Sequence, residues 1–302
     1  MSGVIPEDVL DKYMKAGEIA AKVRAEMRRI TREGMPIIEL CERAEDMIRR
    51  MGGKPAFPCN VSVNEVAAHY TSPPGDESRI PEGSLVKVDI GVHIDGYIVD
   101  TATTVCFNDD YRDLVQAAEE ALRVAIKVIR SGLPISKFGS TVQKVINRYG
   151  FKPISNLTGH QISRYVLHAG KTLPNISHIS LAKIKLGEVY AIEPFVTLPD
   201  AAGKVKSGSE AYIFRFVKRK SVKHGGAKRL LRFIENNFRT LPFAERWLKE
   251  YAPREKYLPA FSELLSSKAI FAYPVFIEAS GKMVAQAEHT VLVDKDGAIQ
   301  LT

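Results

Sequence analysis

Apolar positions along the chain follow two periods, one typical of helices and one typical of strands. At the start, Leu10, Tyr13, Val23 and Met27 recur close to the 3.6-residue period of a helix. Similar patterns, each ending at or near a glycine, predict three further helices before residue 151. The predicted helices span residues 7–32, 36–51, 108–132 and 134–150.

Between the two helix pairs lies a predicted β-hairpin, KVDIGVHIDGYIVDTATTV, at residues 87–105. Asp95-Gly96 in its middle is typical of a two-residue hairpin turn. Such a turn sets the register, so that Gly91 lies opposite Asp100. Because successive side chains of a strand point to opposite faces, one face of the first strand is directed toward a core. That face contains Val86, Val88, Ile90 and Val92.

The same register places Asp89 and Asp100 on the other face, as diagonal neighbours about 7–8 Å apart by backbone. Two ionised carboxylates side by side repel each other unless a cation lies between them. The hairpin alone is equally compatible with two solvated aspartates on an exposed face.

The two halves of the predicted domain share an architecture and a local pattern. Each half runs helix, helix, strands, and each has a histidine upstream of a glycine turn that precedes a strand acid by six residues. This recurrence predicts a duplicated fold with a pseudo-twofold axis and a site between the halves. The recurring residues are His69, Gly83 and Asp89 in the first half, and His168, Gly187 and Glu193 in the second.

Composition narrows the class of protein. Of 302 residues, 45% are hydrophobic and 26% are charged, which is typical of a soluble globular chain. No apolar run approaches the roughly 20 residues of a membrane span, so no membrane association is expected. The first residues include acids and no signal-peptide core. The three cysteines lack metal-type spacing, so we expect reduced thiols and a cytoplasmic protein.

After residue 208 the pattern changes to short helices, and strands return only near residue 272. We therefore expect a catalytic domain of residues 1–210 and 272–302, with an inserted helical subdomain at residues 211–271. The net charge of +8 is concentrated in this insertion, where residues 211–234 contain eight Lys or Arg and no acid. Such a cluster attracts phosphate backbones, although a solvated helix face has the same composition.

Five residues on or beside predicted strands are candidate metal ligands. Four carboxylates and one imidazole suit two divalent ions better than a structural zinc site, which favours thiolates and histidines. Singly, His160 is also compatible with a turn histidine and Glu288 with an exposed strand acid. The candidates are Asp89, Asp100, His160, Glu193 and Glu288.

Four blocks resemble the signature blocks of methionine aminopeptidases: VDIGVHIDGYIVDTATTV, TGHQISRYVLHAG, YAIEPF and AQAEHTVLV. The resemblance covers residues 7–293. The long interval between Glu193 and Glu288 and the block AFPCNVSVNEVAAHYT are similar to type 2 enzymes of the archaeal kind. This resemblance implies an α+β pita-bread fold, in which a curved antiparallel sheet carries two pseudo-twofold-related helix pairs, plus the helical insertion.

The resemblance also implies a role for each matching residue. Two divalent ions (Co, Mn, Fe or Zn) would be held by Asp89, by Asp100 and Glu288 as bridges, and by His160 and Glu193. The implied catalytic residues are His69, His168 and Glu193, and both histidines would also bind substrate. The implied pocket for the methionine side chain is lined by Phe57, Leu167 and Tyr273.

The implied activity is removal of the initiator methionine from nascent proteins and peptides by a hydroxide that two metal ions activate. We expect a monomer, and we consider that the basic segment 215–232 could dock on the ribosome. Two alternatives stay open at this point. One is a Xaa-Pro aminopeptidase or dipeptidase of the same fold, and the other is a non-catalytic homologue that binds nucleic acid or ribosomes.

Overall fold

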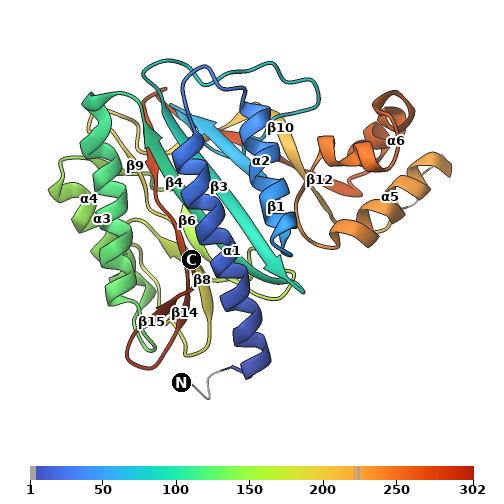
Figure 1. Cartoon of the computed structure of the whole chain (residues 1–302). Coiled ribbons are helices and arrows are strands. Elements are labelled where there is room, and N and C mark those ends of the chain that lie inside the picture. Colours follow the sequence, from blue (N-terminus) through green and yellow to red (C-terminus); the bar gives the residue numbers. More distant parts are fainter. Residues whose placement is uncertain (1–4, 221, 223–224) are drawn as a thin grey trace.

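Helices cover one face of a curved antiparallel sheet in the computed structural model, which describes residues 5–220, 222 and 225–302. In Figure 1 two helix pairs lie in front of the strands. The first half contains α1 (Glu7–Ile30), α2 (Ile37–Arg50), β1 (Lys54–Val63), β2 (Val66–Ala68), β3 (Leu85–Ile94) and β4 (Tyr97–Cys106). The second contains η1 (Asp109–Tyr111), α3 (Arg112–Val128), α4 (Ile135–Arg148), β5 (Lys152–Pro153), β6 (Thr158–Ile162), β7 (Thr172–Pro174), β8 (Val189–Ile192) and β9 (Phe195–Thr197). The remainder contains β10 (Val205–Phe216), α5 (Gly225–Phe238), β11 (Phe243–Ala244), η2 (Glu245–Glu250), α6 (Arg254–Ser266), β12 (Ile270–Glu278), β13 (Val284–Gln286), β14 (His289–Val293) and β15 (Ala298–Gln300).

The strands form four antiparallel groups, with orders β1-β3-β4, β13-β9-β5, β15-β14-β8-β6-β7 and β11-β10-β12-β2. A β-bridge between Ala102 and Glu288 joins β4 of the first half to the residue before β14. The two halves therefore meet at a seam between β4 and β14. The extended segment predicted near the C-terminus forms two strands, β13 and β14, and Glu288 lies between them.

The register of the β3–β4 hairpin confirms the prediction. Gly91 pairs with Asp100, and Asp89 pairs with Ala102. The turn residues 95–96 have φ values of 51° and 87°, as a type I′ turn requires. The apolar face of β3 is buried against α1 and α2, also as predicted.

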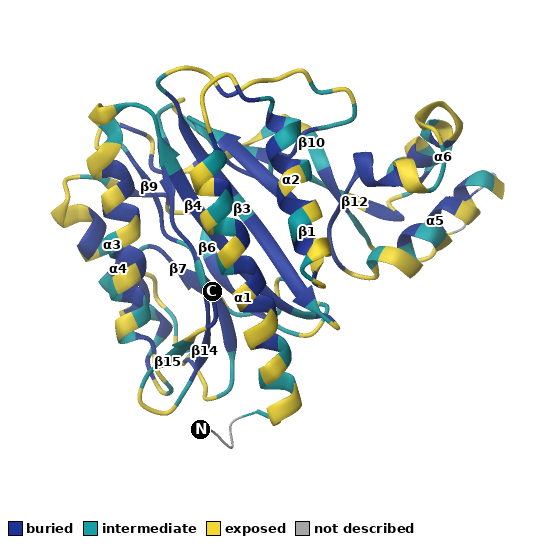
Figure 2. Ribbon diagram, in the orientation of Figure 1, coloured by how far each residue is buried: buried dark blue, intermediate teal, exposed yellow. Residues whose placement is uncertain are grey.

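Each helix pair has its own apolar core against the sheet. Residues of α1 and α2 pack with β1, β3 and β4, and residues of α3 and α4 pack with β8, β13 and β14. Figure 2 shows the buried stripe of each helix turned toward the strands and the exposed stripe turned away. The third predicted helix is shorter than expected, because the backbone becomes extended at Ile129. The other face of the sheet is left for the site.

The segment 211–271 extends to one side of the molecule in Figure 1. Strands β10 and β12 pair antiparallel and run from the body into it, so the expected boundaries at 211 and 271 both fall inside strands. Beyond them, α5, β11, η2 and α6 enclose a separate apolar cluster. Most aromatic residues of this segment, including Phe243 and Trp247, are part of that cluster or pack against it.

Candidate metal centre

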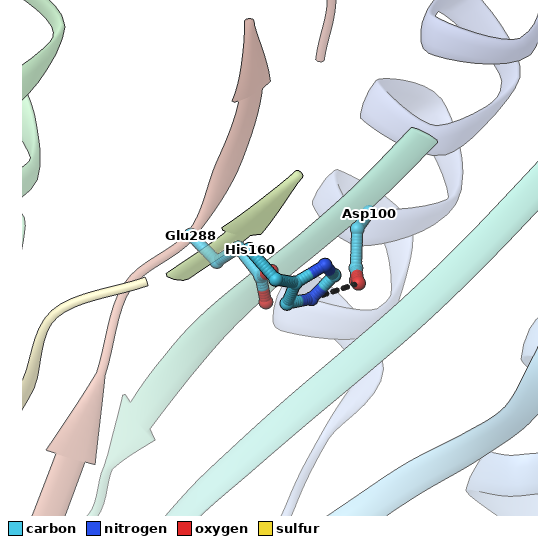
Figure 3. Close-up of side chains that lie close together, drawn as sticks. All are labelled: Asp100, His160 and Glu288. Atoms are coloured by element: carbon cyan, nitrogen blue, oxygen red, sulfur yellow. Dashed lines mark ion pairs between the residues drawn. The ribbon is translucent and has the colours of Figure 1, made fainter. Parts of the chain in front are cut away.

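Three side chains from separate strands meet in a buried group. Asp100 lies on β4, His160 lies on β6, and Glu288 directly precedes β14. One ligand atom of each lies within 4.8 Å of the others. Figure 3 shows the three side chains pointing toward one another, with His160 Nε2 3.6 Å from Asp100 Oδ2. The sheet thus brings together residues that are far apart in the sequence.

The other two candidate ligands, Asp89 and Glu193, border the same cavity but are not part of that compact group. Asp89 lies on β3, diagonally across the hairpin from Asp100. Glu193 lies between β8 and β9, and its Oε1 is 3.3 Å from His160 Nε2. All five candidates therefore line one space.

Burial raises the pKa of the four carboxyl groups. The pKa of Asp100 is raised to about 7. Burial, together with the Asp100 charge, raises the pKa of Asp89, Glu193 and Glu288 well above the ordinary value. Without a cation these groups cannot all be ionised, because like charges at short range repel each other in a poorly solvated space.

Several oxygen atoms of the group are free to bind a cation. Among the residues that the structure describes, Oδ1 of Asp89, Oδ1 of Asp100 and Oε1 of Glu288 are buried and have no hydrogen-bond partner. Buried polar atoms are normally paired, so such a cluster of unpaired oxygens needs an explanation. A carboxylate-rich set with one imidazole suits a divalent ion such as Mn, Fe, Co or Zn. The residues present therefore fit a divalent metal.

Metal binding is expected to release protons, with a defined dependence on pH. Below pH 7 the Asp100 carboxyl is mostly protonated, since its pKa is raised to about 7. An incoming ion must displace that proton, so the apparent affinity for Mn(II) should fall as pH falls, by about tenfold per unit for each proton displaced. Calorimetric titrations in buffers of different ionisation enthalpy measure both quantities. An affinity that stays constant between about pH 6 and pH 7.5 would contradict the prediction.

His160 of the group and two histidines near it are neutral at physiological pH. Burial lowers the pKa of His69 and His160 to about 4 and that of His168 to about 3. The rings of His160 and His168 lie 4.3 Å apart. His69 Nδ1 is 3.2 Å from the carbonyl oxygen of Pro274, which can only accept a hydrogen bond. His69 therefore carries its proton on Nδ1, which leaves Nε2 as an acceptor.

The backbone at His69 has a φ of 67°, which is uncommon for a residue with a side chain. Such conformations cost about 1–3 kcal/mol and are typical of functional sites. The ring packs against Tyr273 and Phe276 of β12, so the neighbouring strand holds it in place.

A cavity of about 320 Å³ joins the acids to an apolar wall. Every residue that the sequence suggested for the site borders it, including Phe57, Leu167 and Tyr273. Ile213 and Pro242 add apolar surface from the segment after residue 210. The lining of the cavity therefore combines carboxylates with apolar side chains.

The position of Phe57 on β1 depends on Gly91, which lies opposite it on β3. A Cβ atom added at Gly91 would lie 2.3 Å from Phe57 Cε1 and 3.0 Å from Ala56 Cβ. We expect Gly91→Ala to displace the Phe57 ring and to reduce kcat/KM for a methionyl peptide by about 10- to 100-fold, the scale of a misfitted apolar pocket. The substitution should also cost about 1–3 kcal/mol of unfolding free energy.

The control for that prediction is a double-mutant cycle. Phe57→Leu removes the ring atoms that an alanine at position 91 would meet. Gly91→Ala should therefore cost less stability in the Phe57→Leu background than in the parent. Equal costs in the two backgrounds, measured by urea denaturation, would show that the glycine is not needed for the ring.

Sequence reasoning missed several polar residues that lie beside the acids. Asn60 pairs with Asp89 across β1 and β3 and lines the cavity. Gln286 Nε2 donates to Glu288 Oε2 at 3.1 Å. Thr290 Oγ1 accepts from the Asp100 N–H and donates to the Asp100 carbonyl oxygen. Because Gln286, Glu288 and Thr290 alternate along one face of a predicted strand, the sequence offered a signal for Gln286 and Thr290. The position of Asn60 opposite Asp89 depends on how β1 pairs with β3, which the sequence pattern does not show.

A curved antiparallel sheet with two helix pairs on one face and a carboxylate-rich site on the other defines the pita-bread class, which confirms the predicted fold class. The chain belongs to metallopeptidase family M24, whose model matches residues 11–295. Metallopeptidases use metal ions, in agreement with the buried Asp100, His160 and Glu288 group.

Close relatives span nearly the whole chain. A methionine aminopeptidase of Methanothermobacter thermautotrophicus is 46% identical over 297 residues, covering 97% of this chain and 99% of the relative. One from Thermococcus onnurineus is 46% identical over 292 residues, covering 96% and 98%. The resemblance predicted from the signature blocks is therefore confirmed.

Solved structures with lower identity share the fold. A thermophilic Arx1 aligns with a TM-score of 0.82 at 20% identity, covering 98% of this chain and 91% of that one. A methionine aminopeptidase of Thermotoga maritima aligns with a TM-score of 0.71 at 22% identity, covering 100% and 99%. A prolidase of Pyrococcus furiosus aligns at 0.62 and 18%, covering 99% of this chain but 65% of the prolidase. Among the described residues, no helix has the length and apolar character needed to cross a membrane.

Proposed function

We propose that this protein removes the N-terminal methionine from nascent proteins and peptides. The observation that carries the proposal is one cavity that is lined both by the buried acids and by apolar side chains. Relatives that are 46% identical along almost the whole chain are methionine aminopeptidases, which supports this substrate over Xaa-Pro peptides.

The metal centre would be formed by the five candidate ligands. The ligand atoms of Asp100 and Glu288 lie close to each other and to His160. These two carboxylates would therefore help to hold both ions. Asp89 would hold one ion, and His160 with Glu193 would complete the other. When bound, two divalent ions would supply a nucleophile at neutral pH and polarise the scissile carbonyl.

The two neutral histidines would bind the substrate in complementary ways. His69 offers the Nε2 lone pair, because its Nδ1–H donates to the Pro274 carbonyl oxygen. It would accept a hydrogen bond from the N–H of the scissile peptide group. His168, also neutral, would donate to the carbonyl oxygen, on which negative charge develops during the reaction.

Glu193 would carry the proton. Its carboxylate lies at the site, with Oε1 3.3 Å from His160 Nε2, where it could take a proton from the nucleophile and give it to the leaving amine. The apolar lining residues Phe57, Leu167 and Tyr273 would receive the methionine side chain.

The test is release of free methionine from a Met-Ala-Ser peptide. Metal-stripped protein is assayed alone and after addition of Mn(II), Co(II), Fe(II) or Zn(II). We expect release only with metal. A Xaa-Pro peptide serves as the competing substrate, and its preferential cleavage would favour the prolidase-type alternative. No release with any metal, from protein that is folded by circular dichroism, would overturn the proposal.

We also propose that residues 211–271 form the inserted subdomain of a type 2 enzyme and dock on ribosomal RNA through the basic segment 215–232. Along this segment Lys218, Lys220, Lys228 and Arg229 are exposed, whereas Lys223 lies outside the described residues. Cytoplasmic location and a monomeric state stay predictions.

The docking proposal has a direct test. Neutralising Lys218, Arg219, Lys220 and Lys223 together should weaken ribosome co-sedimentation, and the parent protein should lose binding as salt rises. Co-sedimentation that is unaffected by the substitutions would remove this segment from the interface.

A further inference from the structure

A half-buried arginine lies behind the candidate metal centre, on the helix-covered face of the sheet. Arg24 projects from α1, which packs on β3 and β4. Its Nη1 donates to Thr101 Oγ1 and to His289 Nδ1, the latter at 2.8 Å. Thr101 directly follows Asp100, and His289 directly follows Glu288. One guanidinium therefore touches the residues next to both proposed bridging ligands.

The hydrogen bonds continue from Arg24 to the backbone of a ligand residue. A guanidinium can only donate, so Thr101 Oγ1 accepts from Arg24 and donates its own proton to the Glu288 carbonyl oxygen at 2.8 Å. His289 Nδ1 likewise accepts, and Thr302 Oγ1 lies 2.9 Å from it. These hydrogen bonds hold the backbone at Glu288, which lies between β13 and β14, from the side opposite the cavity.

The charge of Arg24 has no direct counter-charge. No ion pair joins it to a carboxylate anywhere in the described part of the chain, although Arg28, one turn later, pairs with Glu119 at 3.1 Å. A half-buried cation bonded to neutral partners is costly unless a charge nearby compensates it. Burial and Arg28 lower the pKa of Arg24, whereas the Glu288 carboxylate opposes that shift. Arg24 is therefore held by hydrogen bonds to Thr101 and His289, and not by an ion pair with any described residue.

We propose that Arg24 is a positioning residue for the metal centre, which holds Asp100 and Glu288 in register through Thr101 and His289. The inference rests on the proposed metal centre. It assigns a role in metal affinity to a residue that touches neither metal nor substrate.

The test measures metal binding separately from activity. Arg24→Met should weaken Mn(II) and Co(II) binding by about 10- to 100-fold, the usual cost of losing a residue that orients a ligand. It should also change the visible absorption spectrum of the Co(II)-loaded protein. Arg24→Lys, which keeps a hydrogen-bond donor at the end of a long side chain, should recover part of the affinity. Arg28→Met is the matched control, since Arg28 is on the same helix but donates to Thr103 and Glu119 and not to the residues beside the ligands.

A second variant protects the test against misfolding. Thr101→Val keeps the shape of the side chain and removes the hydrogen bonds of its hydroxyl, and it should weaken metal binding in the same direction. The two substitutions should be non-additive, because they interrupt one path. If both variants bind metal within about twofold of the parent, as Arg28→Met should, then Arg24 is only a structural anchor of α1 and the inference is wrong. If the parent binds no metal, the proposed function fails instead.

Discussion

Asp100→Asn is expected to abolish metal binding and peptidase activity while leaving the fold intact. Asparagine has the same shape, but its amide is neutral and places N–H groups where a cation would bind. Loss of a residue that only orients a ligand costs about 10- to 100-fold in affinity, so loss of a bridging ligand should exceed about 100-fold. Equilibrium titration with Mn(II) and methionine release from a Met-Ala-Ser peptide measure the two effects.

The same substitution should not lower the free energy of unfolding of the metal-free protein. In the folded state the pKa of Asp100 is raised to about 7 from an ordinary 3.8. A carboxyl group with a raised folded pKa destabilises the folded state at pH values above its unfolded pKa, and this penalty is full above the folded value. At pH 8 the metal-free Asp100→Asn protein should therefore be at least as stable as the metal-free parent, whereas Mn(II) should raise only the parent's Tm.

Asp95→Asn is the matched control for that experiment. Asp95 lies in the turn of the same hairpin, is exposed, and makes a surface ion pair with Lys12 at 3.5 Å. Asparagine tolerates its positive φ, so both metal binding and activity should stay unchanged. Tight Mn(II) binding by Asp100→Asn would show that Asp100 is not a ligand.

Local patterns predicted the parts of this fold that depend on neighbours in the sequence. The Asp95-Gly96 turn and the two-residue period fixed the β3–β4 register, so Asp89 and Asp100 could be placed relative to each other without a structure. Helical periodicity located the helix pairs in the same way. The candidate ligands beyond the hairpin were selected by their place on or beside predicted strands, and the resemblance to family blocks implied the role of each.

What the sequence could not provide were contacts between distant residues. Nothing in the local pattern of α1 indicates that Arg24 reaches Thr101 and His289, because that contact depends on how the two halves meet at the β4–β14 seam. The burial of Glu45 could not be predicted either, since an acid on an amphipathic helix is normally a surface residue. Its burial follows from a partner some 200 positions away, Arg246.

Arg246→Met is expected to cause the largest loss of stability. Arg246 on η2 forms a buried ion pair with Glu45 on α2, and both side chains are nearly inaccessible. The guanidinium also donates to Thr71 Oγ1 at 2.8 Å and to the Ser72 carbonyl oxygen at 3.1 Å. Removal of one partner leaves a buried charge uncompensated, which costs about 3–5 kcal/mol. Urea denaturation should show the loss as a lower midpoint with a similar slope.

The mechanism predicts how that loss depends on pH and on Glu45. Burial already raises the pKa of Glu45, and Arg246 opposes that shift. Without Arg246 the pKa should rise further, so the destabilisation should be full near pH 8 and smaller near pH 5.5, where Glu45 can become protonated. Adding Glu45→Gln should recover part of the loss, since the amide oxygen can still accept from the N–H of Cys59 or Trp247 Nε1.

The matched control crosses the same junction at the surface. Lys249 of η2 pairs with Glu42 of α2 at 3.1 Å, with both side chains largely exposed. Lys249→Met should change the free energy of unfolding by less than about 1 kcal/mol, as is usual for surface pairs. If Arg246→Met and Lys249→Met cost the same, the buried pair does not hold η2 on the body. If only Arg246→Met lowers the free energy of unfolding markedly, and the loss becomes smaller at lower pH, an unpaired Glu45 is the cause. The junction between α2 and η2, near Pro242 in the cavity lining, then depends on this buried ion pair.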